Sequence, residues 1–521
     1  MEIINNKAVL FKTRHDPERF QIIPKHKVIE RHDNGGATVA VYWGLDEMRV
    51  LRNLGVRKAP SPIIGRYDWP GRFTPAKHQI ETAAFLTLHR RCFCFNEPGT
   101  MKTSSALWAA DYLMKIGHVR RVLVLCPMSI MYSAWMGDIS KTIIHRSAIV
   151  AHHSKASRRI EMVEKGYEIV ITNYEGLNLI APAIKKDGRF DLVIVDEANG
   201  YKNTQTQRWK ALASVLNPET LLWMMTGTPA SQSPVDAFGL ARLVCPQNVP
   251  KYVTAWREKV QTKVTNFKWV SKPNAKDLVF DALQPAIRFA KKDCLDLPPV
   301  VTETREVPMT PQQKKYYDLL KNQMMFRAAG ETISAVNAGV AVGKLLQISC
   351  GSSLTDTGEV VEFDATPRLG VLREVLEETD RKVIVFASYR SSMDTIEGFL
   401  RKHNYNVAQI NGDVPPSKRG RIIDEFQGPG GLDVLVLQSQ ATAHGITLTA
   451  ADTAVFWGPV MSVELYLQCV ARIDRKGQDS ESVRVIHIQS SPIEEKMFKA
   501  MSRKVSDHSL LVELFNSEIK N

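Results

Sequence analysis

The chain has 521 residues, 44% of them hydrophobic and 24% charged, and its 68 Lys and Arg against 55 Asp and Glu give a net charge of +13. This length is too great for one hydrophobic core, and the composition, with neither a low-complexity tract nor a repeat period, is that of an ordinary globular protein. Seven scattered cysteines without a CxxC pair argue against a disulfide framework and against a zinc site.

The charge balance and the apolar pattern also narrow the cellular setting. A basic protein favours a polyanionic partner such as nucleic acid, although charge of this size can also serve solubility. The N-terminus has no signal-peptide layout, and no apolar run is long enough to span a bilayer. We therefore expect a soluble intracellular protein with no membrane partner, cytoplasmic in a prokaryote or a virus-infected host cell and nuclear in a eukaryote.

Residues 1–71 are predicted to form a small β-rich accessory module. Three short runs alternate as strands do, and one stretch after them has helical spacing. The strand-like runs are Ala8–Lys12, Lys27–Arg31 and Ala37–Trp43, and the helical stretch is Leu45–Leu54. A nucleic-acid contact and a packing or docking role both stay open for this module.

Near residue 72 the pattern changes to short apolar runs that alternate with helical stretches. Nearly continuous Val- and Ile-rich runs are typical of strands buried on both faces of a parallel sheet. These runs are Cys92–Phe95, Val122–Cys126, Glu168–Thr172, Asp191–Val195 and Leu221–Thr226. The sequence predicts an α/β lobe over residues 72–310, with a helical insertion at about 235–290. Ligands of such sheets bind beyond the carboxyl ends of the strands, where polar residues follow these runs.

The stretch Asn96–Thr103 lies between an apolar run and a helical stretch, which is the layout of a phosphate-binding loop. In such loops the free N–H groups at a helix start and a Lys converge on phosphate oxygens, while a Thr hydroxyl reaches Mg²⁺. Lys102 and Thr103 stand at those two positions. The pattern asks for Gly where Asn96 and Met101 stand, so an ordinary Gly/Pro turn before a Lys-bearing helix is the alternative.

An acidic pair, Asp196-Glu197, directly follows the predicted strand Asp191–Val195. Mg²⁺ uses few carboxylates and keeps several waters, so Asp196 could hold it largely through water. Glu197 could orient or deprotonate the water that attacks a γ-phosphate. A solvated acidic turn is the alternative, and the phosphate-binding loop upstream favours the nucleotide interpretation.

Residues 311–366 are predicted to be a helical linking region, and a second strand-and-helix alternation follows over residues 367–521. Its predicted strands are Lys382–Ala387, Asn406–Ile410, Asp433–Leu437, Thr453–Trp457 and Ser482–Ile488. Arg472 and Arg475 are three residues apart and would share one face of a helix or its end. Two arginines from a second sheet lobe suit a phosphoryl group held by the first.

In this order, these stretches resemble the two RecA-like lobes of helicase superfamily II, and specifically the Swi/Snf ATPase family. The stretches that carry the resemblance are Thr74–Gln79 (Q motif), Asn96–Thr103 (motif I), Cys126–Ser129 (Ia), Ile171–Glu175 (Ib), Asp196–Asn199 (II), Thr226–Pro229 (III), Gly445–Asp452 (V) and Gln468–Gln478 (VI). The resemblance implies an α/β protein with two parallel-sheet lobes that hydrolyses ATP with Mg²⁺ while moving on double-stranded DNA.

The resemblance also implies roles for individual residues. The expected ATP-binding residues are Gln79, Pro98, Gly99, Thr100, Met101, Lys102, Thr103 and Gly445, with Thr103 and Asp196 as ligands of Mg²⁺. The expected catalytic residues are Glu197, Lys102, Arg472 and Arg475. Residues expected to couple hydrolysis to motion are Asn199, Thr226, Thr228 and Gln468. The expected nucleic-acid contacts, mainly to the backbone, are Ser129, Asn173, Tyr174, Lys202, Thr442 and His444.

Departures from the family pattern leave other functions open. Met101 replaces a Gly of motif I, Asn199 replaces the usual His of motif II, and Thr447 replaces an Asn of motif V. One alternative is an ATP-gated nucleic-acid clamp with impaired hydrolysis, and another is a helicase that separates strands of DNA or RNA. The shortness of the chain favours a viral or prokaryotic member that works as a monomer in replication, recombination or repair.

Overall fold

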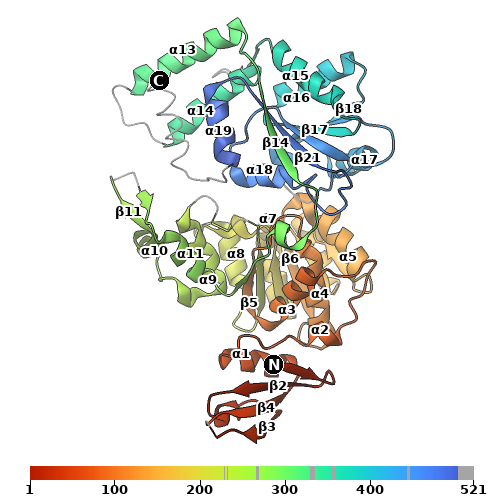
Figure 1. The fold of residues 1–521 in the computed structure, drawn as a ribbon, viewed down its shortest axis with the longest axis vertical. Helices are drawn as coiled ribbons and strands as arrows, with labels where there is room; N and C mark the ends of the chain where they lie inside the picture. Colours follow the sequence, from red (N-terminus) through yellow and green to blue (C-terminus); the bar gives the residue numbers. More distant parts are fainter. Residues whose placement is uncertain are drawn as a thin grey trace. The chain divides into compact units, whose positions relative to one another are not determined.

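The computed structural model describes residues 1–33, 35–227, 229–230, 233–265, 269–328, 335–354, 359–442 and 446–502 (Figure 1). These residues divide into two compact units. Unit 1 consists of Met1–Ala230 and Pro234–Cys294, and Leu295 begins the main part of unit 2. Within the described residues, no helix is long and apolar enough to cross a membrane.

The N-terminal part of unit 1 is an antiparallel sheet with strand order β1-β2-β4-β3. Its elements are β1 (Glu2–Ile4), β2 (Ala8–Thr13), β3 (His26–Arg31), β4 (Ala37–Tyr42) and α1 (Leu45–Asn53). Alternate side chains such as Val9 and Val39 point into a core that Met48 and Leu51 of α1 complete. The small N-terminal β-rich sheet of the predicted fold class is thereby confirmed, and the boundary at residue 71 stays a prediction.

The larger part of unit 1 is a seven-stranded sheet with order β13-β5-β10-β9-β6-β8-β7, in which every neighbouring pair is parallel. The strands are β5 (Arg91–Cys94), β6 (Arg121–Leu125), β7 (Ala148–Val150), β8 (Ile169–Thr172), β9 (Phe190–Val195), β10 (Leu221–Met225) and β13 (Ala286–Ile287). Successive side chains of a strand enter cores on opposite faces: Cys92 and Cys94 belong to one core, and Phe93 to the other.

Helices cover both faces of this sheet (Figure 1). The helices are α2 (Ile63–Arg66), α3 (Lys77–Leu88), α4 (Lys102–Lys115), α5 (Gly137–Thr142), α6 (Ala156–Glu164), α7 (Tyr174–Asp187), α8 (Gln207–Val215), α9 (Ala237–Val244), α10 (Val253–Val260), α11 (Ala275–Ala282) and α12 (Lys291–Cys294). Core residues of α3 and α4 pack on one face, and those of α7, α8 and α9 on the other. An antiparallel pair, β11 (Gln261–Lys263) and β12 (Trp269–Ser271), joins α10 to α11.

Unit 2 contains a six-stranded parallel sheet with order β14-β21-β20-β17-β19-β18. Its strands are β14 (Val300–Glu306), β17 (Lys382–Ala387), β18 (Val407–Ile410), β19 (Val434–Gln438), β20 (Ala451–Phe456) and β21 (Val483–Gln489), with a separate hairpin β15 (Ser352–Leu354) and β16 (Val360–Glu362). Its helices are α13 (Pro311–Ala328), α14 (Ala335–Ser349), α15 (Thr366–Glu377), α16 (Arg390–Lys402), α17 (Pro416–Gln427), α18 (Val463–Val470) and α19 (Pro492–Ser502). The predicted class, two parallel-sheet α/β lobes with a small N-terminal sheet, is confirmed.

The two parallel sheets contain three strands, β7, β13 and β14, that the sequence pattern did not predict. Unit 1 ends at Cys294, before the boundary expected at residue 310, because β14 pairs with β21 along its whole length in unit 2. Strand β13 lies inside the expected helical insertion at about 235–290, and it pairs in parallel with β5. Its two residues are too few for a periodic pattern to be visible in the sequence.

Candidate functional site

The loop between β5 and α4 has the backbone of a phosphate-binding loop. Gly99 has φ +88° and Met101 has φ +59° and ψ +42°, so both lie in the left-handed region, and α4 begins directly at Lys102. The hydroxyl of Thr100 donates to the carbonyl oxygen of Glu97 (2.8 Å) and closes the turn. The half-buried Lys102 and Thr103 therefore stand in the first turn of a 14-residue helix, where free N–H groups attract an anion.

Asn96, which departs from the expected Gly, has a structural task in the loop. Its buried side chain donates from Nδ2 to Oγ1 of Thr82 (2.8 Å) and accepts at Oδ1 from the amide of Phe289 (3.0 Å). The amide of Glu97 also donates to the carbonyl oxygen of Phe289 (3.0 Å). Asn96 thus joins α3, the loop and the chain that follows β13.

The acidic pair Asp196-Glu197 directly follows β9, at the carboxyl edge of the same sheet. Asp196 is 7% exposed and accepts from Nε1 of Trp135 (3.1 Å) and from the amide of Glu197 (3.0 Å). Burial raises the pKa of the Asp196 carboxyl above its usual range, and the charge of Lys102 and these two hydrogen bonds oppose the rise. Because β5 and β9 run parallel in one sheet with only β10 between them, the loop and the acidic pair lie at the same edge and form one candidate site.

Glu197 is held in an uncommon backbone conformation, with φ +47° and ψ +54°. Non-glycine residues occupy this region only when the surroundings enforce it, and such residues cluster at active sites. The hydroxyl of Tyr174 donates to the carbonyl oxygen of Asp196 (2.6 Å) and lies 3.2 Å from that of Glu197. Tyr174 thereby stabilises the turn that holds Glu197, whose side chain is half-buried.

Gln79 in the first turn of α3 carries a buried donor without a partner. Its Oε1 accepts from the amide of Ala76 (3.0 Å), whereas its Nε2 is buried and makes no hydrogen bond. Buried donors are almost always paired in folded proteins, so an orphaned amide at this place indicates a missing ligand acceptor. The neighbouring His78 contacts the phosphate-binding loop, with Nε2 3.1 Å from the carbonyl oxygen of Thr100.

The residues after β10 pack directly on the phosphate-binding loop. The amide of the buried Thr226 donates to the carbonyl oxygen of Cys94 (3.0 Å). A Cβ added to Gly227 would lie 2.7 Å from Cδ of Pro98, so only glycine fits there without a shift of the loop. Half-buried Asn199 lies in the 3-10 turn after the acidic pair, and Thr228 lies outside the described residues.

The expected nucleic-acid contacts of unit 1 differ in their accessibility. Ser129 is exposed, and Lys202 is half-buried with Nζ 3.3 Å from Oδ2 of Asp236. Asn173 is only 6% exposed and accepts from Arg159 (3.1 Å), and Tyr174 is 9% exposed beneath the acidic pair. The structure therefore places these last two side chains inside the lobe, where their hydrogen bonds hold the strand ends. The sequence showed only that two polar residues follow a strand. It did not show that their side chains point into the lobe.

In unit 2 the two arginines converge on one carbonyl group. Nη1 of Arg472 and Nη1 of Arg475 donate to the carbonyl oxygen of Ile446 (3.1 and 3.0 Å), and Nε of Arg472 donates to that of Gln468 (2.9 Å). Both lie just after α18, so their expected shared position at a helix end is observed. Gly445 and His444 lie outside the described residues, and the backbone of Thr442 ends a 3-10 turn.

The residues of unit 1 fit a nucleotide with Mg²⁺. The orphaned Nε2 of Gln79, the left-handed loop before Lys102 and the buried Asp196 provide a donor for a base, a cradle for phosphates and one carboxylate. Mg²⁺ commonly binds with one or two protein oxygens, waters and phosphate oxygens, which matches Thr103 and Asp196.

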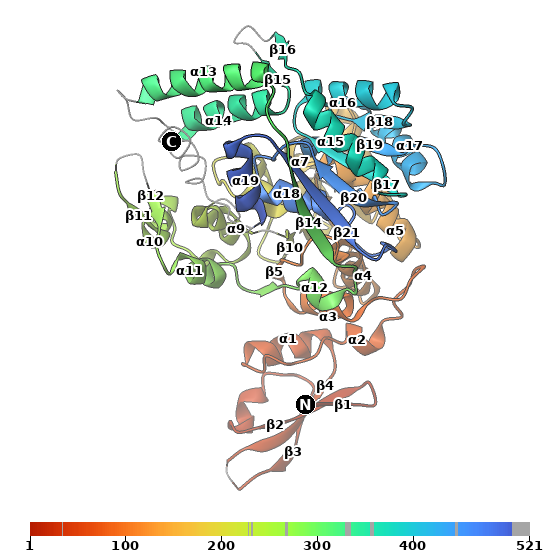
Figure 2. The same ribbon diagram turned by 45° about the horizontal axis from the view of Figure 1, so that its top comes forward.

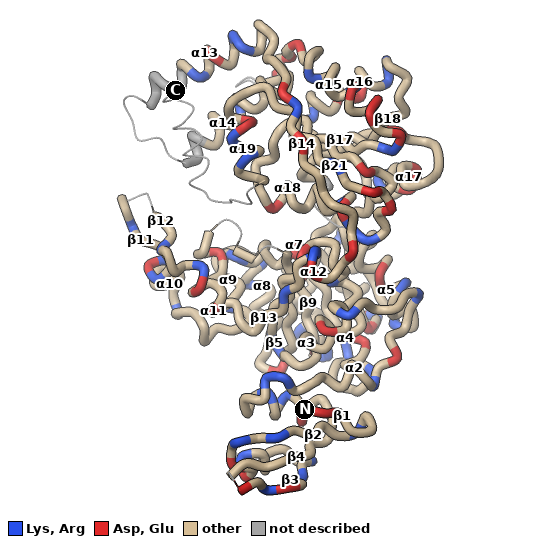
Figure 3. Tube along the Cα trace, viewed as in Figure 1, with Lys and Arg blue, Asp and Glu red and all other residues tan. Residues whose placement is uncertain are grey.

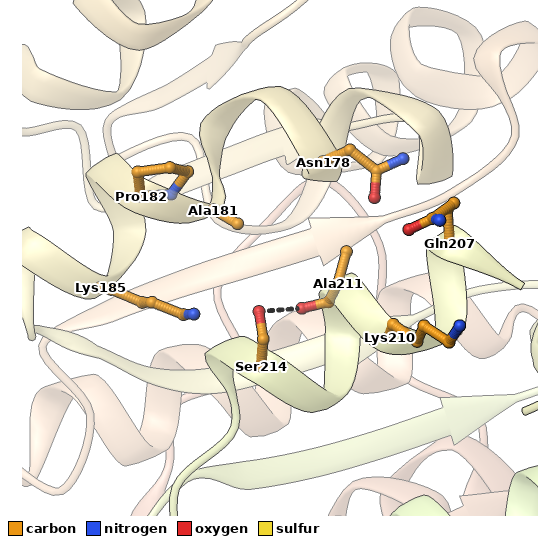
Figure 4. A pocket seen from close by; sticks show the side chains of 8 residues that line it. All are labelled: Asn178, Ala181, Pro182, Lys185, Gln207, Lys210, Ala211 and Ser214. Atoms are coloured by element: carbon orange, nitrogen blue, oxygen red, sulfur yellow. Dashed lines mark hydrogen bonds between the residues drawn. The ribbon is translucent and has the colours of Figure 1, made fainter. Parts of the chain in front are cut away.

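A surface groove of about 620 Å³ lies elsewhere in unit 1, between α7 and α8 (Figure 4). Asn178, Ala181, Pro182, Lys185, Gln207, Lys210, Ala211 and Ser214 line it. Its only hydrogen bond drawn in Figure 4 is that from Ser214 Oγ to the carbonyl oxygen of Ala211 (2.8 Å). None of these residues belongs to the site around Lys102 and Asp196.

Comparison with known proteins gives a consistent assignment. The model of the SNF2-related domain matches residues 39–350, and the model of the helicase conserved C-terminal domain matches residues 367–477. The mouse chromodomain-helicase-DNA-binding protein 1-like is 25% identical over 495 residues, which are 89% of this chain and 54% of that protein. The Arabidopsis thaliana protein CHROMATIN REMODELING 5 is 24% identical over 458 residues, which are 81% of this chain and 26% of that protein.

The chain thus spans about half, or less, of the length of these curated relatives. Among solved structures, the Sulfolobus solfataricus SWI2/SNF2 ATPase core in complex with dsDNA is 20% identical. The similarity covers 87% of this chain and 95% of that one, with a TM-score of 0.42.

Proposed function

The chain belongs to the SNF2-related family, and on this basis we propose that it is a nucleic-acid-stimulated ATPase that moves along double-stranded DNA. The observation that carries the proposal is the joint site of unit 1. There the charge of Lys102, at the start of α4, acts on the buried Asp196, and the adjacent Glu197 is held in a left-handed turn. A solvated acidic turn would require neither the burial nor the constrained backbone.

Each residue of the site has a chemical task in ATP hydrolysis. Lys102 and the first N–H groups of α4 bind the phosphates, and the orphaned Nε2 of Gln79 donates to the adenine base. Thr103 and Asp196 would hold Mg²⁺, which neutralises phosphate charge when bound. Glu197 orients the attacking water and accepts its proton. Arg472 and Arg475 of unit 2 are the cations proposed to stabilise the negative charge of the transition state.

The backbone of DNA is the proposed partner. Ser129, Lys202, Thr442 and His444 are the proposed phosphate contacts. Such contacts position a protein without reading the base sequence, so affinity should fall steeply as salt rises. The two relatives named above are, by name, a helicase-DNA-binding protein and a chromatin-remodelling protein. For this chain we propose translocation on DNA during replication, recombination or repair, by a monomer of viral or prokaryotic origin.

Phosphate release tests this function when it is measured with duplex, single-stranded and forked DNA and with RNA. The proposal expects the greatest stimulation by duplex DNA, without strand separation in a parallel unwinding assay. Stimulation only by RNA or single strands, or efficient unwinding, would favour the helicase alternative. No release with any nucleic acid, together with ATP-dependent DNA binding, would favour the gated clamp, for which the Met at position 101 is the supporting observation.

A further inference from the structure

The most basic segment of unit 1 lies outside the site. Residues 251–276, which comprise α10, the β11–β12 pair and the start of α11, contain seven Lys or Arg and one acidic residue, Glu258. This segment of 26 residues therefore carries +6 of the chain's net +13. We call its described part, residues 251–265 and 269–276, the basic hairpin; this part holds six of the seven cations. It projects from α10 and α11 in both ribbon views (Figures 1 and 2), and Figure 3 marks its Lys and Arg positions in blue.

The cations of the basic hairpin are accessible and lack acidic partners. Five are exposed in the described residues, and Lys272 is half-buried with Nζ donating to the carbonyl oxygen of Glu258 (2.6 Å). The five exposed cations are Lys251, Arg257, Lys259, Lys263 and Lys276. Among the described residues, none of these six forms an ion pair, whereas cations elsewhere in unit 1, such as Arg120 and Arg121, do. Their mutual repulsion is thus not compensated within the protein.

The base of the hairpin is anchored in the lobe, although its strands bury little. Trp256 is fully buried and donates from Nε1 to the carbonyl oxygen of Pro234 (3.1 Å), and the amide of Lys272 donates to the carbonyl oxygen of Val260 (3.0 Å). Beyond this base, β11 and β12 share three residue pairs, and most of their described side chains are exposed. Two isolated strands gain little stability by themselves, so core packing does not explain why the chain keeps them.

Exposed apolar side chains belong to this hairpin or, as Phe280 does, follow it in α11. Tyr252 is 63% exposed, Val264 59%, Val270 46% and Phe280 66%, and the guanidinium group of Arg257 lies 5.7 Å from the ring centre of Trp269. Cations mixed with accessible rings suit a nucleic acid, since ammonium and guanidinium groups bind phosphates and rings stack on bases or pack on sugars. A surface that served solubility alone would need no exposed rings.

We propose that the basic hairpin is a second nucleic-acid contact, which binds the phosphodiester backbone beside the proposed motif contacts and lengthens the footprint of the protein. This contact presupposes the proposed function, because a protein that does not act on nucleic acid would have no use for it. It differs from the motif contacts in its position, since it lies in the insertion that follows α9 and not at the carboxyl edge of the sheet.

The test compares the full-length protein with two triple variants in DNA-binding titrations without nucleotide, at several salt concentrations. The hairpin variant is Lys259→Gln, Lys263→Gln and Lys276→Gln. The matched control is Lys165→Gln, Lys185→Gln and Lys186→Gln, which removes equal charge from exposed lysines of the same unit. The control lysines follow α6 or end α7, which lead back to the starts of β8 and β9, at the edge opposite the site.

For the hairpin variant we expect an affinity about 10-fold lower and a salt slope reduced by up to about 2.7, because each of three lost phosphate contacts lowers the slope by about 0.9. Basal ATP hydrolysis and the rate at saturating DNA should stay unchanged. Titrations with duplex and with single-stranded DNA show which form of DNA the hairpin binds. A loss of affinity for either probe supports the contact. Unchanged affinity and slope for both probes, or an equal loss in the control, would overturn it. Absence of ATPase activity would refute the proposed function but not this binding result.

Discussion

At the scale of single residues, the two departures from the phosphate-loop pattern now have physical explanations. Met101 stands where the backbone is left-handed, which is why a Gly is usual there. Asn96 uses its side chain to join Thr82 and the amide of Phe289. Neither substitution changes Lys102 or Thr103, which the chemistry needs. The loop therefore keeps the backbone of a phosphate-binding loop although its sequence departs from the pattern at two positions.

Met101→Gly should remove the left-handed strain of about 1 kcal/mol, offset in part by the greater flexibility of Gly in the unfolded chain. We expect stability within about 1 kcal/mol of the original and unchanged or higher ATPase activity. Denaturant unfolding and phosphate release measure the two quantities. Met101→Val is the contrasting variant, since a β-branched residue tolerates this conformation worse. A large fall in activity for Met101→Gly would show that the Met side chain has a positive role.

Asn96→Ala should lower the free energy of unfolding by about 1–3 kcal/mol, because it leaves the half-buried amide of Phe289 without its acceptor. Denaturant unfolding of the variant measures the loss. Thr82→Val, alone and combined with Asn96→Ala, isolates the contribution of the Asn96–Thr82 bond. Full additivity of the two substitutions would contradict a direct interaction.

The sequence predicted the chemistry of the site better than the directions of its supporting side chains. Lys102, Asp196 and Glu197 follow strand ends in a recognisable order, and the structure brings the first two within electrostatic reach. The inward direction of Tyr174 and the bridge made by Asn96 depend on tertiary partners far along the chain. No local pattern encodes such partners.

At the scale of secondary-structure elements, the buried strands could be predicted and the irregular edges could not. Strands such as β6 and β17 are apolar because helices cover both of their faces. Strand β14, with the sequence VVTETRE, is mostly exposed at the edge of its sheet and lacks that signal. Its side chains pair instead with charges, as Glu303 does with Arg484.

Strand β21 contains a histidine that should make the stability of unit 2 depend on pH. His487 is 1% exposed, its ring stacks on Phe498, and burial lowers its pKa to about 4. Because the unfolded chain binds a proton near pH 6.5 and the folded chain does not, stability should fall as pH drops from about 6.5 towards 4. Between pH 7 and pH 5 the expected loss from this residue is about 2 kcal/mol.

Denaturant unfolding at a series of pH values checks this expectation. His487→Phe should flatten the dependence, while the remaining slope reflects His89 of unit 1, whose pKa burial also lowers to about 4. An unchanged slope in His487→Phe would mean that this histidine is charged in the folded protein.

At the scale of the whole molecule, length and the alternation of strands and helices were enough to predict two parallel-sheet lobes and an N-terminal sheet. The excess of positive charge indicated a polyanionic partner but not its location. The structure shows that the basic hairpin, with six Lys and Arg against one Glu, carries +5 of the net +13. The basic hairpin and the sequence motifs lie in different parts of unit 1, and both indicate nucleic acid as the partner.

The most direct test of the central claim is phosphate release by the Glu197→Gln variant with saturating duplex DNA, measured beside ATP binding by the same protein. If Glu197 prepares the attacking water, DNA-stimulated release should fall by at least about 100-fold while ATP still binds, since the substitution keeps the shape of the side chain and removes its basicity. Full DNA-stimulated turnover by Glu197→Gln would contradict the assignment of the site.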